Sequence, residues 1–90
     1  SDLAREDRMA KAFPEITIFT RPWCGGVLRV KRWLDRRGIP YTEVDITQDP
    51  EAARRVEALN GGNQSVPTIL IDGVHVATEP STEELERLLG

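Results

Sequence analysis

Cys24 is the residue with the clearest potential for covalent chemistry, because it is the single cysteine among 90 residues. It follows the β-rich run of residues 16–20 and precedes apolar residues at helical spacing, so it falls at or next to a helix start. Unpaired N–H groups and the positive end of the helix dipole favour an anion there. The thiolate is such an anion and is the nucleophile of thiol–disulfide exchange. A lone cysteine is more often a small buried side chain, but this position, with Arg21 nearby, favours a reactive thiol.

The same cysteine count argues against other kinds of site. One cysteine cannot form an internal disulfide. Together with one histidine, His75, it also falls short of a four-ligand zinc site. We therefore expect no metal and no bound cofactor. We interpret His75 as a solvent-facing strand residue rather than as a catalytic base.

Two further features fall where a reacting sulfur would need room and partners. Gly25 and Gly26 each weaken a helix by about 1 kcal/mol relative to alanine, and their missing side chains leave room for a second sulfur. Val66–Pro67 begins a later strand, and an X–Pro bond there can be cis. A cis bond would leave the Val66 backbone groups free to hydrogen-bond the peptide-like backbone of a thiol ligand. From spacing alone, the cis and trans alternatives both remain open.

The helices that must position these residues are predicted from apolar spacing and capping residues. The first starts next to Cys24 and ends at Gly38. The second begins at residues 49–50, an Asp N-cap followed by proline at the first helical position, and stops at residues 60–62. The third begins with a capping-box pattern, Ser81 with Glu84. The apolar residues that define the first and third helices are Val27, Val30, Leu34, Leu85, Leu88 and Leu89.

The strands are predicted from short apolar or alternating runs. Residues 16–20 form a β-rich run that stops before a proline, as a central strand must. Residues 41–46 alternate apolar and polar side chains, which indicates a half-buried strand. Residues 66–71 and 74–77 flank Asp72–Gly73, and an Asp-Gly pair suits the positive φ angles of a type I′ hairpin turn.

The predicted element order is therefore β-α-β-α-β-β-α, which places the chain in the α/β class. A β-α-β start requires a parallel strand pair, and the hairpin adds antiparallel strands. We expect a four-stranded mixed sheet covered by three helices, the topology of the thioredoxin fold. Residues 14–90 are assigned to this domain. Residues 1–13 are expected to be a polar arm or helix, part of which reflects an uncertain start site, and are given no function.

Composition and charge narrow the range of partners. The chain is 39% hydrophobic and 30% charged, which is ordinary for a globular protein rather than a disordered one. Its net charge of −3 gives no electrostatic reason to expect nucleic acid. No apolar run approaches the roughly 20 residues that a membrane helix needs, and no signal-peptide pattern is present. We expect a cytoplasmic protein that binds neither nucleic acid nor membrane.

Three segments resemble a known family. Residues 19–25, Phe-Thr-Arg-Pro-Trp-Cys-Gly, resemble the strand-to-helix active-site segment of the glutaredoxins, and residues 66–68 resemble their cis-proline segment. Residues 59–68, with 79–81, most resemble the mycoredoxins, the actinobacterial members that act with mycothiol. The resemblance runs from about residue 16 to residue 89, nearly the whole chain.

The resemblance implies a cytosolic oxidoreductase, monomeric, that removes a low-molecular-weight thiol (mycothiol or glutathione) from S-thiolated proteins. Cys24 would be the catalytic nucleophile, and the Val66–Pro67 bond would be cis. The thiol would lie in a groove between Trp23, Cys24, Val66 and the turn at residues 79–82. There the first N–H groups of the last helix would meet a ligand carboxylate or hydroxyl. The residues expected to bind the thiol are Arg21, Trp23, Val66, Pro67, Ser81 and Thr82.

Val27 departs from the family pattern at a decisive place. Family members usually carry a second cysteine three residues after the first, and Val27 occupies that position here. Without a resolving thiol, Cys24 cannot close an internal disulfide and release a reduced protein. The remaining route is monothiol: Cys24 takes the small thiol from the protein, and a second free thiol regenerates Cys24. The sequence leaves open whether this is a natural monothiol protein or an inactivated one.

Two rival functions remain open. Some single-cysteine glutaredoxins bind a [2Fe–2S] cluster between two chains, but those carry Phe-Ser where this chain has Gly26–Val27. The other rival function is that of a redox-inactive module, which would bind thiols or peptides through the groove alone. Trp33 is interpreted as core or groove wall. The arginines at positions 29, 32, 36 and 37 are interpreted as a solvated helix face, and nothing in the sequence favours a role in guiding an acidic protein partner.

Overall fold

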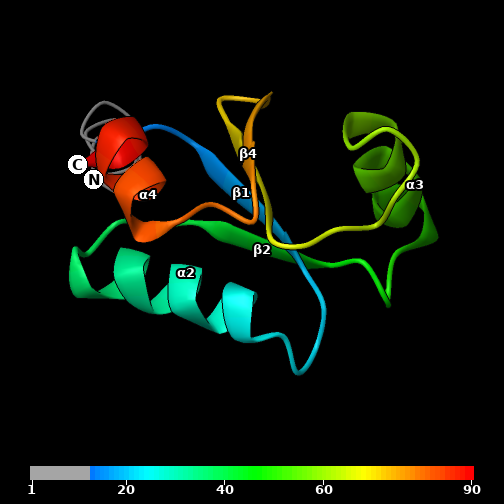
Figure 1. The fold of residues 1–90 in the computed structure, drawn as a ribbon, viewed down its shortest axis with the longest axis horizontal. Coiled ribbons are helices and arrows are strands. Elements are labelled where there is room, and N and C mark those ends of the chain that lie inside the picture. The colour runs from blue at the N-terminus through cyan, green and yellow to red at the C-terminus, as the bar shows by residue number, and fades with distance from the viewer. Residues whose placement is uncertain (1–12) are drawn as a thin grey trace, which may run out of the picture.

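A four-stranded mixed sheet forms the centre of the molecule, which a computed structural model describes from residue 13 to residue 90 (Figure 1). Its strands are β1 (Ile16–Thr20), β2 (Thr42–Asp45), β3 (Thr68–Ile71) and β4 (Val74–Thr78). They lie in the order β2-β1-β3-β4, with β1 parallel to β2 and antiparallel to β3, and β3 antiparallel to β4. This is the predicted thioredoxin fold. The arm predicted before residue 14 lies almost wholly outside the described residues.

The described helices are α2 (Gly25–Arg36), α3 (Pro50–Leu59) and α4 (Thr82–Leu89), and they cover both faces of the sheet. Figure 1 shows α2 and α4 on one side and α3 on the other. The alternation of β1 explains this arrangement, since Ile18 packs with α2 and α4 residues whereas Phe19 packs with α3 residues. Both faces of β1 are therefore buried, as expected of a central strand.

The helix starts follow the predicted capping residues, with one difference between them. Asp49 accepts a hydrogen bond from the Ala52 N–H at 3.1 Å, and Ser81 and Glu84 form a reciprocal capping box. By contrast, α2 has Cys24 as its N-cap residue and no side-chain cap. The start of α2 therefore keeps N–H groups that no capping side chain occupies.

The turns and strand ends refine the expected boundaries. Asp72 and Gly73 have φ angles of 51° and 79°, so both central residues of the hairpin turn are left-handed, as a type I′ turn requires. β3 begins at Thr68 rather than at residue 66, because Pro67 has no N–H to donate to the ladder. β2 is also shorter than the predicted run of residues 41–46. Val66 and Pro67 therefore lie before β3, next to the end of β1.

Candidate active site

Cys24 is the last residue of the loop between β1 and α2. Its backbone is extended, with φ −109° and ψ 116°, and its carbonyl accepts the first α2 hydrogen bond, from the Leu28 N–H at 3.1 Å. The side chain is partly buried and takes no part in capping the helix. The sulfur thus stands at the positive end of the α2 dipole, close to open N–H groups.

The segment before β3 forms one wall beside this sulfur. The Sγ atom of Cys24 lies 3.9 Å from the carbonyl oxygen of Val66, and the Val66–Pro67 peptide bond is cis. The Pro67 carbonyl accepts a hydrogen bond from the Glu79 N–H at 2.7 Å. The sulfur, Val66–Pro67 and the turn that begins at Glu79 are therefore connected through backbone contacts.

The two glycines after Cys24 differ in their surroundings. A Cβ atom added at Gly26 would lie 3.4 Å from Pro67 Cδ and 3.9 Å from the Cys24 sulfur. A Cβ atom added at Gly25 would meet nothing within 4 Å. A Cβ atom at Gly26 would therefore crowd the sulfur and Pro67, whereas Gly25 borders the open cavity beside Cys24.

Arg21 links the loop before α2 to the segment before Pro67. Its guanidinium donates to the Gln64 carbonyl oxygen at 2.6 Å. The partner is an uncharged carbonyl, so this bond holds the two segments together and leaves the positive charge of Arg21 unneutralised by it. Arg21 also lines the cavity at Cys24, where the charge favours a bound anion.

Trp23 projects from the surface beside Cys24 and lines the cavity there. Its side chain is 102% exposed, and its φ angle of 60° is left-handed, which is uncommon for a residue other than glycine. Such a conformation costs of order 1 kcal/mol and is most often kept at functional sites. The indole therefore stands in solvent at the rim of the cavity beside Cys24.

A cavity of about 450 Å³ opens next to Cys24, on the side that faces β2. Its lining is mainly apolar and includes a few charged groups. The residues that line it are Thr20, Arg21, Pro22, Trp23, Cys24, Gly25, Val27, Leu28, Lys31, Glu43 and Asp45. Val66 and Pro67 do not line this cavity, so it lies on a different side of the sulfur from them.

The turn at residues 79–82 lines a second, separate cavity of about 490 Å³, together with Arg29 of α2. The sequence predicted one groove from Trp23 to this turn, whereas the structure has two hollows. The Ser81 N–H already donates to Glu84 within the capping box, at 3.4 Å. Ser81 and Thr82 are both exposed at the start of α4, and three carboxylates share this cavity with them.

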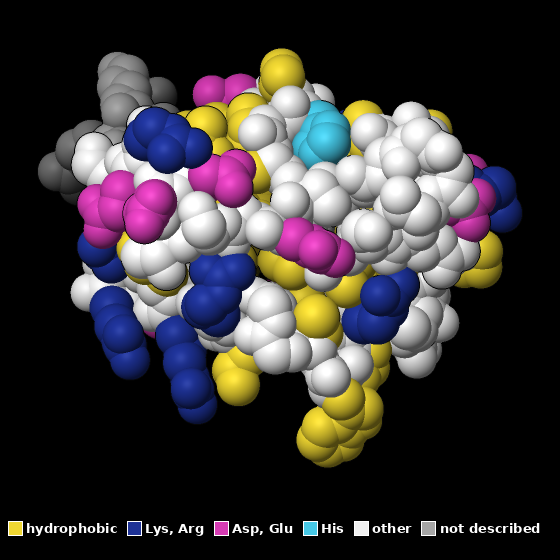
Figure 2. Space-filling model, in the orientation of Figure 1, with side chains coloured by type: hydrophobic (Ala, Val, Ile, Leu, Met, Phe, Trp, Pro, Cys, Tyr) yellow, Lys and Arg dark blue, Asp and Glu magenta, His cyan; other side chains and the backbone are white. Residues whose placement is uncertain are grey.

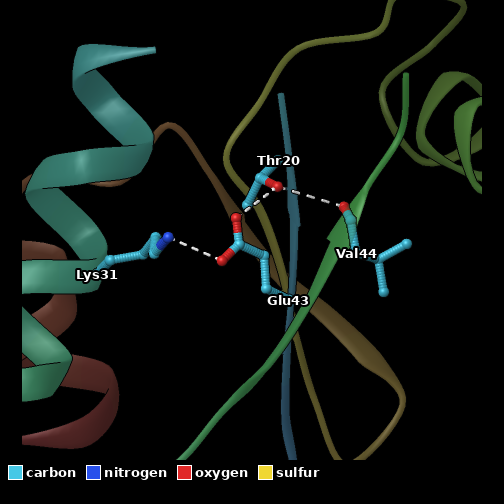
Figure 3. Close-up of polar contacts among 4 residues, drawn as sticks. All are labelled: Thr20, Lys31, Glu43 and Val44. Atoms are coloured by element: carbon cyan, nitrogen blue, oxygen red, sulfur yellow. Dashed lines mark hydrogen bonds and ion pairs between the residues drawn. The ribbon is translucent and has the colours of Figure 1, made fainter. Parts of the chain in front are cut away.

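A polar cluster that the sequence did not indicate contributes to the lining of the cavity beside Cys24. Figure 3 shows its side chains, which come from β1, α2 and β2. Glu43 pairs with the Lys31 ammonium at 2.8 Å and accepts a hydrogen bond from the buried Thr20 hydroxyl at 3.0 Å. The hydrogen bond from Lys31 lowers the pKa of Glu43, and the same bond raises the pKa of Lys31. The cluster joins the end of β1 to α2 and β2, the three elements that surround the cavity.

His75 lies outside this site. It is half-buried, with part of its side chain visible at the surface (Figure 2), and its Nε2 atom hydrogen-bonds the Thr78 hydroxyl at 2.8 Å. Thr78 in turn donates to Asn60, whose amide reaches the buried Thr68 hydroxyl. His75 is therefore part of a structural network behind the Val66–Pro67 segment. Trp33, by contrast, is buried in the core together with Leu85 of α4. Of its two predicted roles, core and groove wall, it therefore has the core role.

Residues 13–90 contain neither a candidate metal site nor a candidate membrane-spanning helix. No group of three or more His, Cys, Asp or Glu side chains in this part of the chain is placed to hold a metal ion. Within the same residues, no helix combines the length and the apolar character needed to cross a bilayer.

A model of the family described as glutaredoxin matches residues 16–76, more than half of the chain. The chain belongs to the glutaredoxin family. The matched residues include β1, Cys24, all of α2 and the Val66–Pro67 segment. The chemistry of this family is thiol–disulfide oxidoreduction, with a glutathione-type or mycothiol-type thiol as co-substrate.

Individual relatives agree with this assignment. A Mycobacterium tuberculosis protein provisionally named a glutaredoxin is 42% identical over 74 residues, which cover 82% of this chain and 88% of that protein. Mycoredoxin 1 of Corynebacterium glutamicum is 38% identical over 71 residues, 78% of this chain and 86% of that protein. The solution structure of a Brucella melitensis glutaredoxin has a TM-score of 0.69 at 31% identity, and the match covers 86% of this chain and 83% of that one.

Proposed function

We propose that this glutaredoxin is a monothiol oxidoreductase that removes mycothiol, or glutathione where that is the available thiol, from S-thiolated proteins. The observation that carries the proposal is the position of the Cys24 sulfur. It is partly buried at the uncapped start of α2 and borders a cavity of about 450 Å³. The sulfur therefore stands at the positive end of the α2 dipole, where a disulfide can reach it from solvent.

The reaction has two exchange steps. The Cys24 thiolate attacks the small-thiol sulfur of the mixed disulfide, so a Cys24–small-thiol disulfide forms and the protein leaves as a thiolate that takes a proton from water. A second small-thiol thiolate then attacks the small-thiol sulfur bound to Cys24. This step releases the Cys24 thiolate and a symmetrical small-molecule disulfide. The net reaction converts the mixed disulfide and one free small thiol into the reduced protein and the symmetrical disulfide, so the free thiol of the second step is the reductant.

Val27 supports a monothiol route. It occupies the place where a resolving thiol would stand, and it is buried with Phe19 and α3 residues while one edge lines the cavity. A valine there packs against the core and offers no group that could attack the Cys24 disulfide. The second step therefore depends on an external thiol, for which the cavity leaves an approach.

The thiol ligand is proposed to lie along Val66 and Pro67, with further contacts from Arg21, Trp23, Ser81 and Thr82. The Val66 carbonyl faces the sulfur at 3.9 Å, so a thiol joined to Cys24 would have this backbone beside it. The name of the Corynebacterium relative, mycoredoxin 1, favours mycothiol as the physiological thiol. We further propose that the protein works as a monomer in the cytoplasm, where small thiols keep protein cysteines reduced.

The test is turnover of one S-thiolated peptide prepared in two forms, with mycothiol and with glutathione, each assayed with its own free thiol. We expect Cys24→Ser to abolish both reactions while thermal unfolding stays close to that of the parent chain. The parent should turn over the mycothiol form faster. The proposal would be contradicted if Cys24→Ser kept the activity of the parent protein. It would also be contradicted if the parent protein turned over neither form of the peptide.

A further inference from the structure

A row of exposed side chains runs along α2 from the reactive sulfur. Leu28, Arg32 and Arg36 follow Cys24 at steps of four residues, and side chains four residues apart lie on one helix face. Leu28 is 48% exposed, and both arginines are exposed. The fully exposed Trp23 stands at the start of the row. We call Trp23, Leu28, Arg32 and Arg36 the α2 row.

The α2 row carries positive charge in a chain whose net charge is −3. Lys31, also on α2, is neutralised by its ion pair with Glu43, and neither Arg32 nor Arg36 forms an ion pair with any residue from 13 to 90. The one acidic residue of α2, Asp35, interacts with Tyr41 and forms no ion pair with Arg32 or Arg36 among residues 13–90. In Figure 2, Lys and Arg side chains project from the surface of α2, and a hydrophobic side chain extends beyond the loop that precedes it.

This arrangement is apolar next to the sulfur and cationic farther along the helix. Exposed aromatic and arginine side chains are the types enriched where proteins meet proteins. The row also lies beside the cavity that faces β2, to which both Trp23 and Leu28 contribute, and that cavity is on a different side of the sulfur from Val66–Pro67. The cavity therefore leaves room for the protein half of a mixed disulfide to extend from the sulfur over α2.

We infer that the α2 row is the docking surface for the S-thiolated protein. The partner that fits this row is a protein segment with an apolar residue beside the modified cysteine and carboxylates farther along the segment. At 1.5 Å per residue of helix, Arg32 and Arg36 lie about 12 and 18 Å along α2 from Cys24. An extended peptide advances about 3.3 Å per residue, so the carboxylates belong about four to six residues from the cysteine. This inference rests on the proposed function, because it names the substrate of the same cysteine.

The test uses peptides of about ten residues whose cysteine is joined to thionitrobenzoate, with leucine beside it. One peptide carries glutamates at the fourth to sixth positions beyond the cysteine, and its matched partner carries lysines there. The Cys24 thiolate attacks the peptide sulfur, the peptide becomes disulfide-bonded to Cys24, and yellow thionitrobenzoate leaves as the thiolate. The readout is the ratio of the two second-order rate constants, which needs no small thiol.

The net charge of the chain favours the lysine peptide, whereas the α2 row favours the glutamate peptide. We expect the glutamate peptide to react about fivefold faster at low salt, and the ratio to fall towards one at about 0.5 M salt. The double variant Arg32→Glu/Arg36→Glu should reverse the ratio. The control Arg54→Glu/Arg87→Glu makes the same change in net charge at exposed arginines of α3 and α4, and should keep the ratio.

A second variant tests the apolar part of the row without altering charge. Leu28→Gln should reduce the advantage of a leucine over a serine beside the peptide cysteine. A lysine preference in the parent protein, or equal effects of the two double variants, would overturn the docking inference alone. If the glutamate peptide reacts faster as expected but S-thiolated peptides are not turned over, only the proposed function is overturned. No release of thionitrobenzoate from either peptide would overturn both.

Discussion

The Cys24 sulfur lies 3.9 Å from the Val66 carbonyl oxygen, although the two residues are 42 positions apart. This contact brings the start of α2 against the segment before β3. Gly26 lies in the same contact region, because a Cβ atom there would be 3.4 Å from Pro67 and 3.9 Å from the sulfur. The space beside the nucleophile is therefore set by two chain segments and by one missing side chain.

The first prediction concerns that missing side chain. Gly26→Val adds methyl groups between the sulfur and Pro67, so we expect kcat/KM for a mixed disulfide to fall by about tenfold, or about 1.4 kcal/mol of transition-state stabilisation. Gly25→Val makes the same chemical change where a Cβ meets nothing within 4 Å, and should cost much less. Steady-state kinetics of both variants measure the difference. Equal losses would show that Gly26 has no special place beside the sulfur.

The second prediction concerns Val27. Val27→Cys places a thiol three residues after Cys24 on α2, at a position that lines the same cavity. We expect an internal disulfide to form on mild oxidation, and reduction of a protein disulfide to become possible without a mixed-disulfide substrate. The smaller side chain should cost about 1 kcal/mol of stability. Thiol titration before and after oxidation, with Val27→Ala as the packing control, is the measurement. Two free thiols after oxidation would contradict the expectation.

The third prediction concerns the ion pair between Lys31 and Glu43. The hydrogen bond from Lys31 lowers the pKa of Glu43 in the folded protein below its unfolded-state value near 4.5. The pair therefore stabilises the folded state fully above that unfolded-state pKa, and this stabilisation is lost as pH falls through the lower folded-state pKa. Both side chains are about one-third exposed, so solvent screening limits the pair to about 0.5 kcal/mol at neutral pH.

A double-mutant cycle with Lys31→Gln and Glu43→Gln, read by urea unfolding, isolates this coupling. We expect it to shrink in about 0.5 M salt and to disappear in acid. The pKa of Lys31 is raised by the same bond, so the coupling is also lost as pH rises through that value. A coupling that is independent of pH and salt would exclude an electrostatic origin.

The fourth prediction concerns the network behind the Val66–Pro67 segment. Asn60 donates to Val56 and Thr68 and accepts from Thr78, with donor–acceptor distances of 2.6 to 3.0 Å. Asn60→Ala leaves the buried Thr68 hydroxyl with one partner fewer and should cost about 2 kcal/mol. Gln48→Ala, at an exposed position, should change stability by less than about 0.5 kcal/mol. Urea unfolding compares the two, and similar costs would refute a structural role for the network.

Local sequence patterns were sufficient to predict the helices, strands and turns of this fold. The Asp49–Pro50 start, the Ser81–Glu84 capping box and the Asp72–Gly73 turn depend on residues close together in the chain, and all three occur as expected. The position of Cys24 at the start of α2 follows in the same way. It needs only the end of one apolar run and the beginning of the next.

The sequence alone determined the fold class, the family resemblance and the identity of the single thiol, because each is read from neighbouring residues. Only the tertiary structure decided which groups surround that thiol. The ion pair of Lys31 with Glu43, the bond from Arg21 to Gln64 and the half-buried position of His75 depend on strand order and helix packing. The separation of one expected groove into two cavities has the same origin, since cavities form where distant segments meet and no local period encodes them.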